Sequence, residues 1–243
     1  TKNYTYSPLG NILSGPPGTY SYGSTTSGVF SNPHAATSIG AVNFTYDKNG
    51  NQTTDGTWTN TWDFKNRLVQ SAKTGLTVNY TYDYTGNRIK KTDSVNNTPT
   101  YYISSSYEVE GGLTRHHVSA PGIGSIATVN TTSSTVAYVY HHADHLGSSH
   151  VETNASGTVL QYLIYEPYGK TRYNYQSGAY NDPYKFTGKE LDTETGLQYF
   201  GARYYNAPVG RFISADPIFL GLGTGGLEGL KDPQIWNSYA YGR

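Results

Sequence analysis

The sequence has no cysteine and no methionine among its 243 residues. Their absence excludes disulfide bridges, thiolate nucleophiles and soft sulfur ligands for metals. Charged residues make up only 14% of the chain, and 17 basic residues balance 17 acidic ones. A chain without net charge lacks the field that attracts nucleic acid or an anionic lipid surface, so nucleic acid is not an expected partner.

Long apolar runs are also missing. No stretch approaches the ~20 apolar residues that a membrane-spanning helix requires, so no membrane span is expected. The N-terminal residues TKNYTYSPLG contain neither an initiator methionine nor the basic and apolar regions of a signal peptide. The sequence is therefore expected to be a piece of a longer protein. Helical periodicity is weak throughout, and the best short-helix candidate is residues 227–230.

The motifs of several common enzyme classes are absent. The sequence contains no Gly-x-Ser-x-Gly elbow, no phosphate-binding P-loop and no cysteine nucleophile. Gly221, Gly223 and Gly226 fit the spacing of a dinucleotide-binding loop. They lack the strand, helix and downstream acidic residue that such a loop needs, so they predict a flexible loop instead. No cofactor is expected.

Tyrosine is abundant. It occurs 25 times, and aromatic residues reach 14% of the chain although hydrophobic residues in total make up only 35%. Disordered chains are poor in aromatic residues, so this composition predicts a folded protein whose packing depends on tyrosine. A tyrosine ring packs against its neighbours in a sheet while its hydroxyl stays in water or finds a partner.

Several segments repeat one plan, in which two aromatic residues two positions apart precede a polar residue and a glycine. The clear copies are YTYSPLGNIL from Tyr4, FTYDKNGNQT from Phe44, YTYDYTGNRIKK from Tyr80 and LIYEPYGKTR from Leu163, the last with leucine in the first aromatic position. A weaker copy, TWDFKNRLVQ from Thr61, lacks the glycine. Internal repeats of this length are typical of one β-hairpin per copy.

Each part of the plan has a structural reason. Aromatic residues at alternate positions face the same side of a strand, where cross-strand pairs stabilise a sheet. The glycine supplies the positive φ of a tight turn, and the preceding Asp or Asn can accept hydrogen bonds from that turn. We therefore predict an all-β fold of antiparallel hairpins with little helix. Residues 13–40 and 92–100 are rich in Gly, Pro, Ser, Thr and Asn and predict long loops or turns.

The copies that end in Gly-Asn-Arg resemble the YD repeats of Rhs proteins, and the chain from Tyr138 resembles the Rhs repeat-associated core. The matching pieces are YVYHHADHLGSSHVETNASGTVLQY, YEPYGK, KFTGKELDTETGLQYFGARYYNAPVGRFISADP and DPQIWNSYAY. The resemblance implies YD-type hairpin repeats over residues 1–137 and the associated core over residues 138–243. It also implies a spiralled antiparallel sheet that forms part of the wall of a hollow shell, as in bacterial polymorphic toxins, Tc toxins and teneurins.

The same resemblance implies a function. The shell of a secreted or cell-surface protein would enclose its own C-terminal, toxin-like cargo domain and release it by aspartyl autoproteolysis. Asp216, in SADP, matches the family's catalytic aspartate, and Asp232, in DPQIWN, is our candidate for the partner carboxylate. Two carboxylates held close together cannot both ionise, so one can act as acid and the other as base. Arg211 is expected to orient or charge-balance this site.

The resemblance also places the cleaved bond beyond Arg243, so whether this segment alone is an enzyme stays open. Within the stretch LQYFGARYYNAPVGRFISADP, we expect a return strand at residues 197–205, a turn at 206–210 and a second strand at 211–217.

Two alternatives concern other residues. A group of histidines and one aspartate could hold zinc: His116, His117, His141, His142, Asp144, His145 and His150. The corresponding family pattern implies no metal, so we expect hydrogen bonding by His142, Asp144 and His145, and no metal site. The rival function is a cell-surface or filament scaffold that binds glycans or other copies of the chain. It predicts an exposed patch formed by Tyr20, Tyr22, Trp58 and Trp62.

Overall fold

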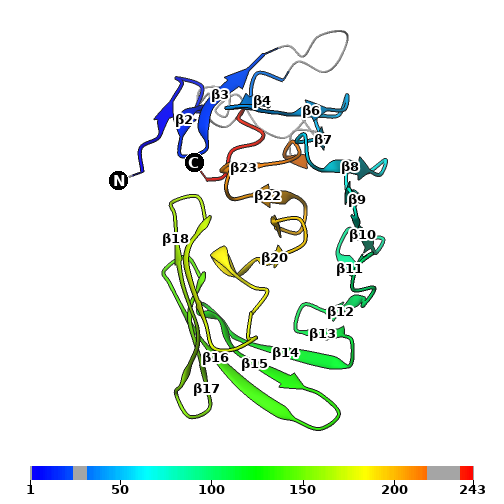
Figure 1. Ribbon diagram of the computed structural model, residues 1–243, viewed down its shortest axis with the longest axis vertical. Helices are drawn as coiled ribbons and strands as arrows, with labels where there is room; N and C mark the ends of the chain where they lie inside the picture. Colours follow the sequence, from blue (N-terminus) through cyan, green and yellow to red (C-terminus); the bar gives the residue numbers. More distant parts are fainter. Residues whose placement is uncertain (1, 24–31, 218–235, 243) are drawn as a thin grey trace. The chain divides into compact units, whose positions relative to one another are not determined.

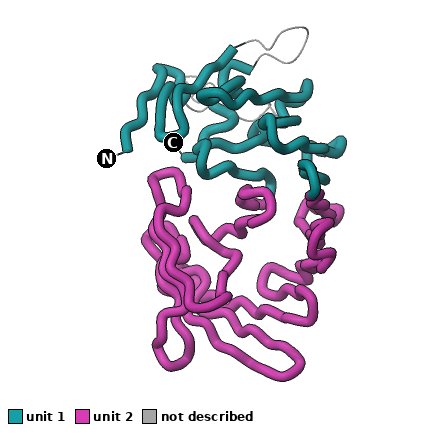
Figure 2. The backbone as a smooth tube through the Cα atoms, viewed as in Figure 1, with its two compact units in different colours: residues 1–75, 202–243 teal, residues 76–201 magenta. Residues whose placement is uncertain are grey.

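The computed structural model describes residues 2–23, 32–217 and 236–242. The chain forms two compact units, one of residues 1–75 with 202–243 and the other of residues 76–201 (Figure 2). Almost all regular structure in the described residues is β-strand (Figure 1). The single helix in these ranges is η1, a three-residue 3-10 helix at Phe186–Gly188. No helix that the structure describes is long and apolar enough to cross a membrane.

The first unit begins with five strands that pair in chain order. They are β1 (Thr5–Tyr6), β2 (Ile12–Gly15), β3 (Gly18–Tyr22), β4 (Ala36–Ile39) and β5 (Val42–Asn43). The expectation of long loops or turns is therefore wrong for residues 13–15, 18–22 and 36–39, and residues 24–31 lie outside the described part of the chain. Tyr20 on β3 is buried and pairs opposite Ile39 on β4, so alternating apolar residues form strands here despite the Gly- and Pro-rich composition.

Four further strands of this unit form consecutive antiparallel hairpins. They are β6 (Thr45–Tyr46), β7 (Gln52–Thr54), β8 (Thr59–Trp62) and β9 (Leu68–Lys73). These strands contain the second and the weaker copy of the repeat, so both copies form the hairpins that the sequence predicts.

The second unit is built on ten strands, each antiparallel to the next in the chain. They are β10 (Leu76–Tyr82), β11 (Arg88–Asp93), β12 (Thr100–Ser104), β13 (Tyr107–Glu110), β14 (Leu113–Ala120), β15 (Gly124–Thr131), β16 (Val136–Ala143), β17 (Ser149–Asn154), β18 (Val159–Tyr165) and β19 (Thr171–Gln176). A small hairpin follows, formed by β20 (Glu190–Asp192) and β21 (Leu197–Tyr199). Residue 138, where the sequence suggests a boundary, lies within β16.

The aspartate of the repeat organises the hairpin turns. The carboxylate of Asp63 accepts hydrogen bonds from the backbone N–H groups of Lys65 and Arg67, two and four residues later. The same arrangement recurs at three other turns, which begin at Asp47, Asp144 and Asn154. Asp83 accepts from the N–H groups three and four residues later. A side-chain acceptor at the first turn position therefore stabilises these five turns, as the repeat predicts.

A buried group of charges holds the β20–β21 hairpin against the sheet of the second unit. Arg88, the arginine of the Gly-Asn-Arg repeat, pairs with Asp192 at 2.8 Å and also with Glu190. Its guanidinium lies 4.3 Å from the ring centre of Tyr199, and Lys91 binds Asp192 at 3.1 Å. Because a buried charge without a partner is strongly destabilising, these contacts determine the position of the β20–β21 hairpin on the sheet.

The stretch at residues 197–217 differs from its predicted division. The expected strand at 197–205 is interrupted, because β21 ends at Tyr199 and Gly201 takes a φ of 80° before β22 (Tyr204–Asn206) begins. The expected strand at 211–217 is only β23 (Arg211–Phe212), which pairs with β22. Just beyond it, the N–H of Ile213 still donates to the carbonyl of Tyr204 in β22, while the carbonyl of Ile213 accepts from the N–H of Gln52. The turn between β22 and β23 lies where it was predicted.

We predict that Gly169→Ala destabilises the protein more than Gly157→Ala does. Both glycines have a φ near 80°, so alanine costs about 1–2 kcal/mol of backbone strain at each. A Cβ at Gly169 would also overlap the buried ring of Phe186, whereas nothing lies within 4 Å of one at Gly157. The overlap should add about 1–3 kcal/mol in urea unfolding. Equal losses for the two variants would show that the Phe186 ring moves freely out of the way.

Candidate functional site

Asp216 lies just beyond β23 in the first unit. Its carboxylate forms an ion pair with Arg203, with 2.9 Å between Oδ2 and NH2. Its backbone N–H donates to the carbonyl of Ser238, also at 2.9 Å. The Asp216 side chain keeps 29% of its surface exposed. The carboxylate is therefore fixed by a positive partner and still open to solvent.

Arg203 is a residue that the sequence analysis missed, although it stands in the GARYY piece of the family resemblance. Its guanidinium carbon lies 3.6 Å from the ring centre of Phe212, and its NH1 donates to the carbonyl of Ser238. Burial lowers the pKa of Arg203, and the charge of Asp216 partly offsets that effect. Stacking and hydrogen bonding thus hold this arginine beside the predicted catalytic carboxylate.

Arg211 has a different environment from the one expected. Only 3% of the residue is exposed. Its NH2 donates to the carbonyl of His34 at 2.6 Å and to Oδ1 of Asn237 at 2.9 Å, and its NH1 donates to the Tyr22 hydroxyl at 3.2 Å. All three acceptors are neutral. Arg211 therefore ties residues near both ends of the chain together within the first unit, and Arg203 supplies the charge beside Asp216.

Asp232 lies outside the described residues. So do Gly221, Gly223 and Gly226 and the short-helix candidate at residues 227–230. The pairing of Asp216 with Asp232 and the catalytic roles of Asp216, Asp232 and Arg211 stay predictions.

A second candidate site is a row of polar side chains on one face of the sheet in the second unit. The row consists of Glu108, His117, Thr128, His141, Glu152 and Gln161 on successive strands β13 to β18. Strand alternation produces it: on β16 Val139 and His141 face the covered side, while Tyr140 and His142 are more exposed. Residues that alternation would normally make apolar are polar here.

The segment between β19 and β20 covers this row through side-chain hydrogen bonds. The Tyr180 hydroxyl donates to Oε2 of Glu152 at 2.7 Å, and the Tyr184 hydroxyl donates to Oε2 of Glu108 at 2.9 Å. The Lys185 ammonium donates to Oε1 of Gln161 at 3.0 Å. These hydrogen bonds offset the cost of removing the polar row from water.

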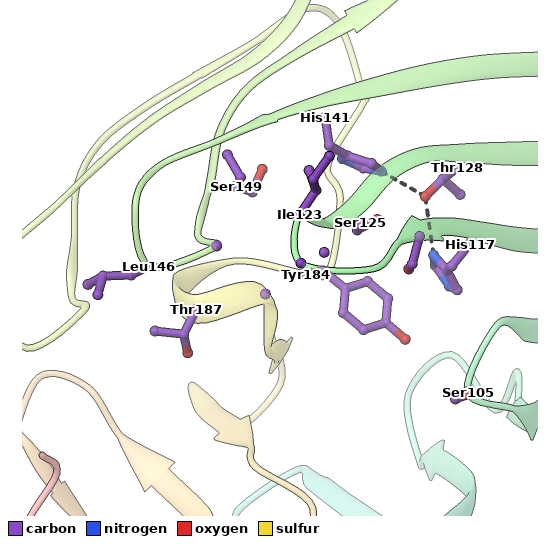
Figure 3. A pocket seen from close by; sticks show the side chains of 16 residues that line it. Ser105, His117, Ile123, Ser125, Thr128, His141, Leu146, Ser149, Tyr184 and Thr187 are labelled. Atoms are coloured by element: carbon purple, nitrogen blue, oxygen red, sulfur yellow. Dashed lines mark hydrogen bonds between the residues drawn. The ribbon is translucent and has the colours of Figure 1, made fainter.

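Thr128 connects two histidines of the row. Its hydroxyl lies 3.2 Å from Nδ1 of His117 and 2.8 Å from Nε2 of His141 (Figure 3). The other ring nitrogen of His141, Nδ1, lies 3.6 Å from Oε1 of Glu152. Asp182, from the covering segment, completes a group in which one ligand atom of each of His141, Glu152 and Asp182 lies within 4.8 Å of the others.

The charges of this group interact strongly. Burial and the neighbouring charge of Glu152 raise the pKa of Asp182 to about 6. Burial opposes the charged forms of His141 and Glu152. The contact with Glu152 and the charge of Asp182 nevertheless raise the pKa of His141, and the contacts with His141, Ser149 and Tyr180 lower the pKa of Glu152. Without a metal ion, these shifts favour a protonated, positively charged His141 beside the two carboxylates.

A cavity of about 550 Å³ opens beside the polar row. His117, Thr128, His141, Ser149 and Tyr184 are among its lining residues (Figure 3). A cavity of this size with converging polar groups is typical of a small-ligand or ion site.

Within the predicted histidine group, most members do not meet one another. His142 bonds through Nε2 to the Thr153 hydroxyl, and Asp144 caps its own turn, so the expected hydrogen-bonding roles of these two residues are confirmed. His150 bonds to the carbonyl of Leu163. Only His141 joins a potential metal-binding group, and its partners Glu152 and Asp182 were not singled out. Strand alternation could have indicated Glu152, but no local pattern points to Asp182.

The aromatic patch predicted by the rival scaffold function is wrong. Tyr20 and Trp58 are only 4% and 8% exposed. The Tyr22 hydroxyl donates to the carbonyl of Ile12, and the Trp62 indole donates to that of Gln52. These rings pack within the first unit because their polar atoms have partners there.

Comparison with known proteins agrees with the fold. Residues 127–243 match the Teneurin YD-shell family. The chain is 31% identical over 249 residues to the tRNA3(Ser)-specific nuclease WapA of Bacillus spizizenii, across 98% of this chain and 10% of that protein. It is 37% identical over 95 residues to the toxin subunit YenC1 of Yersinia entomophaga, across 38% of this chain and 9% of that protein. The chain thus spans about a tenth of the length of these relatives.

Solved structures match over nearly the whole chain. The crystal structure of TcdB2-TccC3-Cdc42 superposes with a TM-score of 0.67 at 20% identity, covering 99% of this chain and 15% of that one. The Tc holotoxin pore of Photorhabdus luminescens gives a TM-score of 0.63 at 20% identity, covering 98% and 12%. The predicted all-β fold of antiparallel hairpins is confirmed. The chain belongs to the Rhs and YD-repeat proteins, and its C-terminal half is of the Teneurin YD-shell type.

Proposed function

We propose that this chain is a wall segment of a larger shell that encloses a C-terminal, toxin-like cargo and releases it by cutting its own backbone beyond Arg243. The names of the relatives support this proposal, because WapA is described as a tRNA nuclease and YenC1 as a toxin subunit. The present chain corresponds to about a tenth of each. We assign the toxic activity to the cargo domain, which is the main partner, and the whole protein to secretion or the cell surface.

The environment of Asp216 is the observation that carries the cleavage proposal. A structural aspartate of this sheet, such as Asp192, is fully buried between positive groups. Asp216 instead keeps an accessible carboxylate that a stacked arginine holds in place. A fixed, solvent-accessible carboxylate is what a water-activating base requires.

In the proposed reaction the ionised carboxylate of Asp216 removes a proton from a water molecule, which attacks the carbonyl carbon of the cleaved peptide bond. The protonated carboxyl of Asp232 donates its proton to the departing amine nitrogen as the carbon–nitrogen bond breaks. The products are a new C-terminal carboxylate on the shell and a new amino terminus on the cargo. Arg203 positions Asp216, and Arg211 holds the side chain of Asn237.

We predict that a chain extended through its native continuation beyond Arg243 cuts itself, and that Asp216→Asn and Asp232→Asn each leave it intact. Removing an acid or base that acts in the transition state should slow cleavage at least about 100-fold. Intact mass spectrometry and gel electrophoresis of freshly purified protein measure the cut product.

Asp83→Asn is the matched control, since it makes the same chemical change at an exposed turn. It should be cut at the wild-type rate. An extended chain that stays whole, or an Asp216→Asn variant that is cut as fast as wild type, would contradict the proposal.

We also predict that Arg211→Lys lowers the free energy of unfolding by about 2–4 kcal/mol, because lysine cannot reach the three acceptors of the buried guanidinium at once. Arg67→Lys makes the same change in a partly exposed pair with Asp63 and should cost at most about 1 kcal/mol. Urea unfolding compares the two variants. Equal losses of unfolding free energy in the two variants would contradict the positioning role that we assign to Arg211.

A further inference from the structure

We propose that His141, Glu152 and Asp182 form a binding site for one divalent metal ion of the zinc class in the second unit. The three residues come from β16, from β17 and from the segment that covers the sheet. One ligand atom from each lies within 4.8 Å of the other two. The site is separate from Asp216 and does not depend on the cleavage proposal.

The distances suit coordination better than direct hydrogen bonding. Nδ1 of His141 and Oε1 of Glu152 are 3.6 Å apart, beyond the ordinary range of a hydrogen bond. Nitrogen and oxygen ligands at their usual distances from tetrahedral zinc lie about 3.3 Å from each other. Contraction of the three side chains around an ion, from separations within 4.8 Å to about this value, would complete the site.

The hydrogen bonds around His141 leave the correct nitrogen for a metal. Nε2 lies 2.8 Å from the hydroxyl of Thr128, which is in turn 3.2 Å from Nδ1 of His117. A proton on Nε2 can be donated to Thr128, whose own proton can be donated to His117. Nδ1 of His141 then presents a lone pair towards the two carboxylates. Metal-binding histidines typically donate their second N–H in this way.

The two carboxylates are also held in place. Glu152 accepts hydrogen bonds from the Tyr180 and Ser149 hydroxyls, and Asp182 accepts one from the backbone N–H of Tyr184 at 2.6 Å. Each oxygen has a further lone pair that can bind a cation. Such second contacts orient the ligands of metal sites.

The charge balance favours a divalent cation. Glu152 and Asp182 are buried and acidic. A bound metal ion would take the place of the proton that otherwise gives His141 its positive charge. The Lys185 ammonium donates its hydrogen bonds to the amide oxygens of Gln161 and Asn181, and its charge also attracts Asp182 and Glu152. A doubly charged ion would neutralise both carboxylates, which otherwise need a proton to be buried at low cost.

The location of the site has a structural consequence. His141 and Ser149 line the cavity of about 550 Å³, so the site borders this cavity on the His141 side. Three protein ligands leave a fourth position for a water. Because Asp182 belongs to the covering segment, the ion would cross-link this segment to strands β16 and β17.

The test is a titration of chelator-treated protein with zinc chloride, followed by calorimetry and by thermal unfolding. We expect one ion per chain and a rise in Tm of about 5 °C or more when free zinc exceeds the dissociation constant a hundredfold. His141→Gln and Asp182→Asn should each weaken binding at least 10-fold, a typical minimum for losing a ligand-shell contact. Cobalt chloride added to wild type should give the visible absorption of a tetrahedral ion.

His142→Gln is the matched control, since this neighbouring histidine bonds only to Thr153 among the described contacts and should bind zinc as wild type does. Far-ultraviolet circular dichroism without metal checks that each variant is folded. Zinc binding by either folded ligand variant, His141→Gln or Asp182→Asn, is sufficient to test the proposal. No stoichiometric binding by wild type would overturn the proposal. Binding that is unchanged in the folded His141→Gln or Asp182→Asn variant would overturn it as well.

Discussion

The buried pairing of Arg88 with Asp192 and Glu190 is the interaction on which the second unit depends. A sheet of hairpins has two faces, and a single layer leaves each one open unless another part of the chain covers it. Here the chain folds back as a covering segment that ends in the β20–β21 hairpin. Arg88, the last residue of a Gly-Asn-Arg repeat, supplies the positive charge that binds the β20–β21 hairpin. The same residue therefore belongs to the repeat and holds the covering segment in place.

The covering segment also explains why the inner face of this sheet can be polar. Tyr180, Tyr184 and Lys185 each satisfy one member of the polar row, so Glu152, Glu108 and Gln161 can be buried without apolar packing. The same contacts bring Asp182 to His141 and Glu152. Beyond β21 the chain continues into the stretch that carries Arg203 and Asp216.

The sequence predicts the local structure well and the long-range structure less well. Alternating aromatics and turn aspartates such as Asp63 and Asp83 identify the hairpins, because both signals act within a few residues. Within residues 13–40 the Gly and Pro content hides strands β2, β3 and β4, because it outweighs the alternation around Tyr20. Arg203 beside Asp216, and Asp182 beside His141, could not be predicted, since these contacts depend on how the chain returns across its own sheet. Only the family resemblance pointed to Asp216.

Hydrogen–deuterium exchange of the Arg88→Gln variant, with Lys90→Gln as the control, tests this account most directly. Loss of the buried arginine leaves two carboxylates without their partner, a change worth about 3–5 kcal/mol. We expect amides of residues 184–199 to exchange at least about 100-fold faster in Arg88→Gln, while those of β14 to β16 keep their protection. Unchanged protection of residues 184–199 would show that the covering segment is held by something other than this charge pairing.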